Sequence, residues 1–261
     1  MRLKKEKIVM KKIKWGVIGP GSIATAFAHS IQHARNSELV SVFGRNSKKT
    51  ENFANEFKIS SYQNLSDFIS SSAIDAVYIA TPHSEHFVFT LEAIKHHKHV
   101  LCEKPFTINA HESMTLIDLA QTSNVFLMEA FMYRTHPQTA NILNNLDFIL
   151  DCNKKILIEA SFGFKAEVPD GHRLRNPNLG GGAILDVGCY PLTMCKLIAG
   201  HLQGLPFADP LSLEAEGALD DTGVDLKSNA HLIFADNIEA RISCAIDKEL
   251  PNHLVISSGS N

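Results

Sequence analysis

The sequence predicts an α/β protein in which a domain with a doubly wound parallel sheet precedes an α+β domain with a mostly antiparallel sheet. In the first half of the chain, short apolar strands alternate with helices of about ten residues, a pattern typical of parallel sheets. From about residue 137, strands follow one another with few helices between them. We therefore expect a disordered tail at residues 1–11, a first domain at 12–136 and a second domain at 137–261.

The elements of the first domain are predicted from apolar runs separated by helical patterns. The expected strands are 13–18, 38–43, 59–62, 76–80, 99–102 and 125–128. The expected helices are 23–34, 48–57, 65–70, 85–96 and 110–123. Each helix joins one strand to the next, so neighbouring strands should run parallel.

The second domain is predicted from apolar runs with turn residues between them. Its expected strands are 156–164, 211–217, 230–234 and 238–245. A loop rich in glycine and proline, residues 168–182, leads into an expected helix at 183–198. This loop and helix are the main interruption in a domain that otherwise consists of strands.

The composition favours a protein that works on small molecules. A hydrophobic content of 44% and a charged content of 20% are ordinary for globular domains, and a net charge of −3 gives no basic surplus for nucleic acid or an anionic membrane. The five cysteines form no C-x-x-C pair, which favours reduced thiols and a cytoplasmic location. We see no apolar stretch of the roughly 18 residues that span a bilayer. We expect no metal, because His96, His97 and His99 have no convergent cysteine or carboxylate.

The basic opening segment lacks the apolar region and cleavage site of a signal peptide. Met10 directly precedes the segment in which the first strand starts. We therefore expect Met10, rather than Met1, to be the natural initiator.

A glycine turn follows the first expected strand and opens the first expected helix. At this position, free backbone N–H groups and the positive end of the helix dipole can bind a pyrophosphate. Ala24 replaces the third glycine of the dinucleotide fingerprint, which the fingerprint permits because that position only needs a small residue. The turn predicts a Rossmann domain, and the alternative is a structural turn in another α/β protein. The expected cofactor contacts here are Gly19, Pro20, Gly21, Ser22 and Ile23.

The end of the second expected strand indicates which dinucleotide binds. Domains that prefer NAD place an acid there, whereas this chain has Phe43-Gly44-Arg45-Asn46. Arg45 can grip a 2′-phosphate with its planar guanidinium, and Lys48 or Lys49 can add charge. NADP is therefore expected in preference to NAD, unless Arg45 is only a solvated loop residue.

Three polar residues are suited to alcohol oxidation, which needs a base for the hydroxyl proton and a cation for the developing alkoxide. Lys104 lies at the carboxyl end of an expected central strand, beside the crevice in which such sheets bind ligands. Asp186 and Tyr190 are four residues apart on one expected helix, so both can point to one substrate. The alternatives are a surface lysine, a helix-terminal acid and a core tyrosine.

Several motifs together resemble the Gfo/Idh/MocA family of oxidoreductases, in the branch that contains dihydrodiol dehydrogenase and NADP-dependent xylose dehydrogenase. The motifs are ATPHSEH at 80–86, CEKP at 102–105, LMEAFMYR at 127–134 followed by His136-Pro137, and GGGAILDVGCY at 180–190. The resemblance covers residue 12 to the end of the chain, and it implies a cis peptide before the proline of the Glu-Lys-Pro triplet.

The resemblance also implies roles for individual residues. Tyr190 would be the general acid/base, Lys104 would lower the pKa of its phenol, and Asp186 would hold the substrate hydroxyl or orient Lys104. Arg134 and His136 are candidates for substrate contact. Further cofactor contacts are expected at Thr81, Pro82, His83, His86, Glu103 and Lys104, although either histidine could instead cap or pack. Substrate contact and solvation are both open for His172, Arg173 and Arg175, and we expect solvation.

The sequence therefore favours an NADP-dependent oxidoreductase that transfers hydride between the nicotinamide and a hydroxyl of a carbohydrate-like small molecule such as a sugar, polyol or dihydrodiol. Reduction of a keto-sugar, a non-catalytic NADP-binding sensor or regulator and a cofactor-using glycosidase stay open. Members of the family are longer and form homodimers through the C-terminal sheet. The chain ends at Asn261, and we interpret this as truncation, which would expose a sheet edge and could inactivate the enzyme.

Overall fold

The computed structural model describes residues 11–151, 153–169 and 171–259, so the predicted tail lies outside the described residues except for Lys11. The chain separates into two compact units, Met1–Ala130 and Phe131–Asn261. The boundary expected before residue 137 thus falls inside the second unit.

The first unit contains a six-stranded sheet in the order β3-β2-β1-β4-β5-β6, and all of its described strand pairs are parallel. The predicted doubly wound sheet is confirmed. The chain reverses its direction of winding between β1 and β4, and open α/β sheets bind ligands at such a switch point. The strands are β1 (Ile13–Ile18), β2 (Ser37–Phe43), β3 (Ser60–Tyr62), β4 (Ala76–Ile79), β5 (His99–Cys102) and β6 (Leu127–Glu129).

Helices connect these strands and cover both faces of the sheet. Val17 and Ile18 follow one another in β1, are fully buried and belong to different hydrophobic clusters, because successive strand residues point to opposite faces. The helices are α1 (Ser22–Ile31), α2 (Ser47–Phe57), α3 (Leu65–Ile69), α4 (His86–Lys95) and α5 (Ala110–Thr122), and a 3-10 turn, η1 (His83–Glu85), precedes α4.

The sixth strand was expected to begin at residue 125, but β6 begins at Leu127. Asn124 has a left-handed backbone (φ 53°), and the Val125 N–H donates to the Ala120 carbonyl at 2.9 Å. These features belong to the C-terminal cap of α5. The apolar run therefore closes a helix before it becomes β6.

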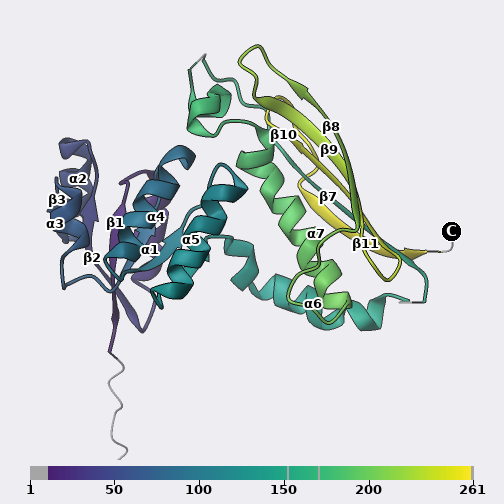
Figure 1. The fold of residues 1–261 in the computed structure, drawn as a ribbon, viewed down its shortest axis with the longest axis horizontal. Helices are drawn as coiled ribbons and strands as arrows, with labels where there is room; N and C mark the ends of the chain where they lie inside the picture. Colours follow the sequence, from purple (N-terminus) through teal and green to yellow (C-terminus); the bar gives the residue numbers. More distant parts are fainter. Residues whose placement is uncertain (1–10, 152, 170, 260–261) are drawn as a thin grey trace, which may run out of the picture. The chain divides into compact units, whose positions relative to one another are not determined.

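The second unit contains a five-stranded mixed sheet in the order β11-β7-β10-β9-β8. Only β10 and β7 are parallel among its described pairs, so the prediction of a mostly antiparallel sheet is confirmed. The α7 helix packs on β7 and β10 (Figure 1), and Ile158, Ile198 and Leu232 are fully buried in this core. The elements are α6 (Pro137–Ile149), β7 (Lys155–Gly163), α7 (Cys189–Leu202), β8 (Ser212–Leu219), β9 (Asp225–Ile233), β10 (Ile238–Ala245) and β11 (His253–Gly259), with 3-10 turns at η2 (Met132–Thr135), η3 (Arg173–Arg175) and η4 (Pro177–Leu179).

Three features of the second unit differ from expectation. The α6 helix was not predicted, because its three asparagines weaken the helical signal, although Pro137 suits its first turn. Residues 253–259 form β11, antiparallel to β7, where no strand was predicted. The expected helix at 183–198 begins with a π-helix over Ile184–Gly188 and continues as α7.

One helical run contradicts our statement that no apolar stretch is long enough to span a bilayer. Pro177–Leu202 meets that length and composition, with a mean hydropathy of 1.3 in its most apolar window. However, 56% of the window is buried within the unit, as in the core helix of a folded domain.

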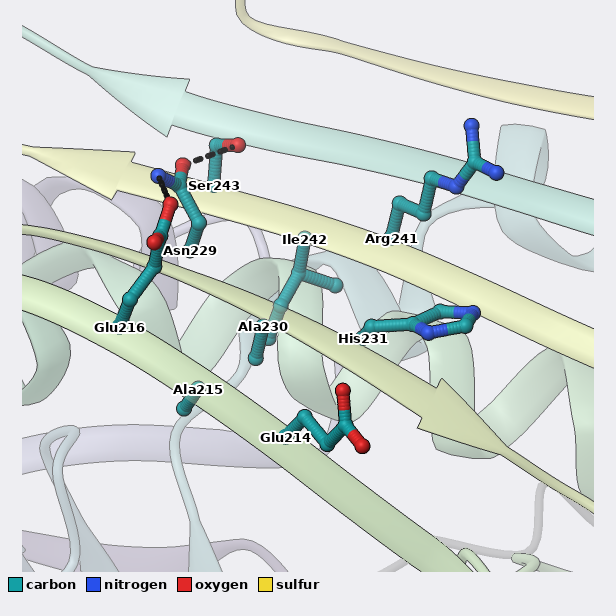
Figure 2. A pocket seen from close by; sticks show the side chains of 9 residues that line it. All are labelled: Glu214, Ala215, Glu216, Asn229, Ala230, His231, Arg241, Ile242 and Ser243. Carbon is teal, nitrogen blue, oxygen red and sulfur yellow. Dashed lines mark hydrogen bonds between the residues drawn. The ribbon is translucent and has the colours of Figure 1, made fainter.

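The sheet of the second unit also has a polar surface. Glu214, Asn229 and Arg241 come from three adjacent strands and border a hollow of about 570 Å³ (Figure 2). Ser243 donates to the Asn229 side chain at 2.8 Å, and that side chain donates to Glu216 at 3.4 Å. The hollow contains none of the residues that we expected to bind cofactor or substrate.

Candidate active site

The glycine turn lies between β1 and α1. Gly19 has φ +92°, and a Cβ there would lie 2.9 Å from the Ala80 carbonyl oxygen, so the position requires glycine. Gly21 precedes α1 without a side-chain cap, and a Cβ on Gly21 would meet no protein atom within 4 Å. The first amides of α1, which include those of Ser22 and Ile23, therefore fit an anion such as a pyrophosphate.

A cavity of about 280 Å³ adjoins this turn. Its walls come from the glycine turn, the segment after β2 and the segment after β4. It includes six of the expected cofactor contacts, Gly19, Pro20, Gly21, Arg45, Thr81 and Pro82. Ser22, Ile23, His83, His86, Glu103 and Lys104 are not among its lining residues.

The cationic wall of this cavity fits a 2′-phosphate. Arg45 is 71% exposed, and Lys49 also lines the cavity. Asn46 caps α2 by accepting a hydrogen bond from the Lys49 N–H at 3.0 Å, which fixes the loop that carries Arg45. Arg45 also forms an ion pair with Glu85, so it is more than a solvated loop residue.

Glu85 was not among the expected site residues. It belongs to η1 and lines the cavity opposite the β2 segment. The only signal in the sequence was its carboxylate within the ATPHSEH motif, and its approach to Arg45 depends on the order of strands in the sheet.

The Glu-Lys-Pro triplet follows β5, and the Lys104–Pro105 peptide is cis. Glu103 accepts hydrogen bonds from the Tyr78 hydroxyl and, at 3.2 Å, from the Lys104 N–H. Tyr78 in turn stacks on Phe27 with ring centroids 4.1 Å apart. The residue before Lys104 is therefore held in place by a hydrogen bond from the buried Tyr78 to its carboxylate.

A second carboxylate lies near this turn and was also missed. Glu129, the last residue of β6, accepts a hydrogen bond from the Phe106 N–H at 2.8 Å. The pKa of Glu129 is raised, mainly because the carboxyl is partly buried, and the negative charge of Glu103 adds to this effect. The Phe106 hydrogen bond and the positive charge of Lys104 lower the pKa but do not outweigh the rise. Its position at the carboxyl end of a parallel strand was the available signal.

His86 connects two loops of the site. Its ring is fully buried, with Nδ1 2.8 Å from the Pro105 carbonyl oxygen and Nε2 2.9 Å from the Thr81 carbonyl oxygen. Burial lowers its pKa, and the two carbonyls oppose that effect. His83 is also buried, with its ring centroid 5.8 Å from that of His86. The contacts of His86 are those of a residue that holds the two loops together.

In the second unit, Asp186 lies in the π-helix and Tyr190 in the first turn of α7. Asp186 is 4% exposed and accepts a hydrogen bond from Arg173 Nη1 at 2.9 Å. The Arg173 side chain, which we expected to contact substrate or to be solvated, is 44% exposed and also pairs with this carboxylate. π-Helical turns inside helices are frequent at functional sites.

Tyr190 lies in an aromatic environment. Its ring centroid is 5.3 Å from that of Phe162 and 5.5 Å from that of Phe131. Its hydroxyl lies 3.7 Å from the Met132 sulfur. The neighbouring Tyr133 donates from its hydroxyl to Thr193 at 2.7 Å, which ties the segment after residue 130 to α7.

The start of the π-helix is held by Asp225, another residue that we had not expected. Its carboxylate accepts from the Ile184 N–H at 2.7 Å, and burial raises its pKa. Gly182 has φ +110°, and a Cβ there would lie 2.1 Å from Asp225 Oδ1. The glycine run thus allows a carboxylate from β9 to cap the helix that carries Asp186.

Other expected residues have contacts within the second unit. Arg134 lies over the Phe207 ring at 4.3 Å, and His136 caps α6 by accepting from the Gln138 N–H at 3.1 Å. Arg175, which we expected to be solvated, pairs with Asp220 at 2.8 Å. Within residues 11–151, 153–169 and 171–259, no group of three His, Cys, Asp or Glu residues could hold a metal ion.

Comparisons with known proteins agree with this arrangement. The model of the oxidoreductase family with an NAD-binding Rossmann fold, GFO_IDH_MocA, matches residues 13–131. A trans-1,2-dihydrobenzene-1,2-diol dehydrogenase from Xenopus tropicalis is 32% identical over 246 residues, which cover 93% of this chain and 72% of that protein. An NADP(+)-dependent D-xylose 1-dehydrogenase from Hypocrea jecorina is 30% identical over 82% of this chain and 60% of that protein.

Solved structures show the same fold. A 3-ketoreductase from Actinomadura kijaniata, in complex with NADP and TDP-benzene, has a TM-score of 0.82 and 26% identity over 96% of this chain and 75% of that chain. An aldose-aldose oxidoreductase from Caulobacter crescentus, complexed with glycerol, has a TM-score of 0.84 and 24% identity over 95% of this chain and 75% of that chain. The resemblance expected from the motifs is confirmed, and this chain belongs to the Gfo/Idh/MocA oxidoreductase family.

Proposed function

We propose that this protein is an NADP-dependent oxidoreductase that transfers hydride between the nicotinamide and a hydroxyl-bearing carbon of a sugar, polyol or dihydrodiol. The observation that carries the proposal is Lys104 at the carboxyl end of β5, beside the anchored Glu103 and the half-buried Glu129. A protein that only sensed the cofactor would not need this set of charges or a phenol such as that of Tyr190.

NADP is the proposed cofactor because the cavity beside the glycine turn has a cationic wall and no acid at the end of β2. Arg45 and Lys49 would hold the 2′-phosphate, and the N-terminus of α1 would hold the pyrophosphate. The xylose dehydrogenase among the relatives uses NADP by name, and the 3-ketoreductase structure contains it.

In the proposed mechanism, NADP would supply the hydride acceptor when bound, and residues of the chain manage the proton and the charge. Tyr190 takes the hydroxyl proton from the substrate as its C–O bond becomes a carbonyl. The Lys104 ammonium would stabilise the developing alkoxide. Asp186 accepts a hydrogen bond from a substrate hydroxyl, and Arg173 keeps its carboxylate in place. The reverse sequence reduces a ketone or an aldehyde.

The names of the relatives support the proposed substrate class, since they act on a dihydrodiol and on an aldose. The test is a panel of xylose, glucose, inositol and a dihydrodiol with NADP, followed by NADPH absorbance. We expect NADPH formation with at least one of them. NADPH binding without turnover on any would favour a non-catalytic sensor over the dehydrogenase.

We also propose that two copies associate through the sheet of the second unit. The face bordered by Glu214, Asn229 and Arg241 carries both signs of charge beside the apolar Ala230 and Ile242, which suits a symmetric interface (Figure 2). Light scattering coupled to gel filtration should give the mass of a dimer, and Arg241→Glu should shift it towards the monomer. A monomeric mass for the unmodified chain would contradict this part of the proposal.

A further inference from the structure

The cavity beside the glycine turn contains a negative charge as well as a positive one. Arg45 comes from the segment after β2, and Glu85 comes from η1 after β4. The two side chains form an ion pair in which Arg45 is 71% exposed and Glu85 only 21% exposed. Glu85 is therefore the fixed member of the pair, and Arg45 is the member that can move to another partner.

Only one oxygen of the Glu85 carboxylate is used in this pair. Oε1 contacts Arg45, whereas Oε2 is buried and has no hydrogen-bond donor among the residues that the structure describes. A buried carboxylate oxygen without a donor costs free energy. A ligand hydroxyl would remove that cost once a rotation of the Glu85 side chain brought Oε2 to the cavity surface.

The two forms of the dinucleotide make opposite demands on Glu85. The 2′-phosphate of NADP carries roughly two negative charges, so it competes with Glu85 for Arg45 and is repelled by the carboxylate. The 2′-hydroxyl of NAD is a donor, and a carboxylate is its usual partner in sheets of this type. Glu85 offers from the β4 side of the cavity the acid that is missing after β2.

We infer that Glu85 is a cofactor-specificity residue that limits the preference of this protein for NADP over NAD. It holds Arg45 when no 2′-phosphate is bound, and it offers an acceptor to a ribose hydroxyl. The inference rests on the proposed function, because it assumes that the cavity beside the glycine turn binds the adenosine end of the dinucleotide.

The test is fluorescence titration of the full chain and of Glu85→Gln with NADPH and with NADH, which measures binding without turnover. The substitution removes the charge and keeps the shape. We expect the dissociation constant for NADPH to fall roughly three- to tenfold, because the 2′-phosphate no longer competes with a carboxylate. The dissociation constant for NADH should stay the same or rise, so the ratio of the two constants shifts towards NADPH.

Two variants control for effects other than the charge in the cavity. Glu92→Gln makes the same chemical change on α4, where Glu92 pairs with Lys95 at 2.9 Å outside the cavity, and it should leave both constants unchanged. Glu85→Asp keeps the charge and should shift the ratio less than Glu85→Gln. Glu85→Gln can also be made in an Arg45→Ala background. A smaller change in the ratio of the two dissociation constants there would show that Glu85 acts partly through Arg45.

The outcomes separate the inference from the proposed function. A wild-type protein that binds neither NADPH nor NADH overturns the proposed function, and this inference with it. A wild-type protein that binds NADPH, combined with an unchanged ratio in Glu85→Gln, overturns the inference alone. A ratio that shifts towards NADH also overturns it, because Glu85 would then orient Arg45 for the phosphate.

Discussion

The two units hold their candidate catalytic groups in different ways. Lys104 follows a strand of a parallel sheet, and the carboxylates near it are fixed by a phenol and by backbone N–H groups of the same unit. Asp186 and Tyr190 lie on a helix whose first turn is a π-helix, held by Arg173 from the preceding loop and by Asp225 from β9. Both arrangements combine one side-chain pair with bonds to backbone N–H groups. They differ in that the first surrounds a turn at a strand end, whereas the second holds the start of a helix.

The largest expected effect separates the roles of the two units. Tyr190→Phe should reduce turnover by roughly 10²- to 10⁴-fold, because the acid/base is lost. It should leave NADPH affinity within about twofold of wild type, since the glycine turn and Arg45 lie in the first unit. Steady-state kinetics and fluorescence titration measure the two quantities. Lys104→Ala should reduce turnover similarly and weaken NADPH binding as well, because Lys104 is also an expected cofactor contact.

The next effect tests how the helix of the second unit is held. Gly182→Ala should lower the free energy of unfolding by about 1–3 kcal/mol, because φ +110° strains alanine and its Cβ would overlap Asp225. Thermal unfolding measures this loss. Gly223→Ala is the matched control, since its φ is +87° but a Cβ there meets no atom within 4 Å. Equal losses in the two variants would show that the contact with Asp225 is unimportant.

A smaller effect is expected for the partner of Asp186. Arg173→Ala should reduce kcat by roughly tenfold with unchanged NADPH affinity, because a carboxylate that binds substrate loses the group that orients it. Arg173→Lys should restore part of kcat, since it restores the charge without the planar guanidinium. Arg175→Ala is the control, because Arg175 pairs with Asp220 at 2.8 Å. A loss of kcat in Arg175→Ala equal to that in Arg173→Ala would argue against a specific role.

The smallest effect concerns pH and the first unit. Burial lowers the pKa of His86 from its ordinary value of 6.5, so the unfolded chain binds a proton more readily than the folded one. This contribution to stability is fully present above pH 6.5 and decreases as the pH falls through 6.5 towards the folded pKa. Thermal unfolding between pH 5 and 7.5 should show a smaller loss of Tm at low pH for His86→Gln than for the wild type. If Tm depended on pH identically in the wild type and in His86→Gln, the pKa of His86 would not contribute to the pH dependence of stability.

The sequence predicted the first unit better than the second for a physical reason. The glycine turn, Arg45 and the Glu-Lys-Pro triplet are short motifs at strand ends, and the topology of a parallel sheet gathers strand ends at one edge. Asp225, Glu129 and Glu85 were missed because each acts on a partner that is distant in sequence. Such contacts depend on strand order and register, which periodicity does not reveal. The π-helix was missed because its apolar pattern resembles that of an α-helix.

The most direct test of the central claim follows the hydride itself. A substrate from the panel that supports NADPH formation is labelled with deuterium at the carbon that becomes oxidised, and the NADPH produced is analysed by mass spectrometry. The account predicts one deuterium on the nicotinamide ring and a sharp loss of labelled product with Tyr190→Phe. NADPH that binds tightly but never acquires the label from any substrate would contradict the assignment of this chain as a dehydrogenase.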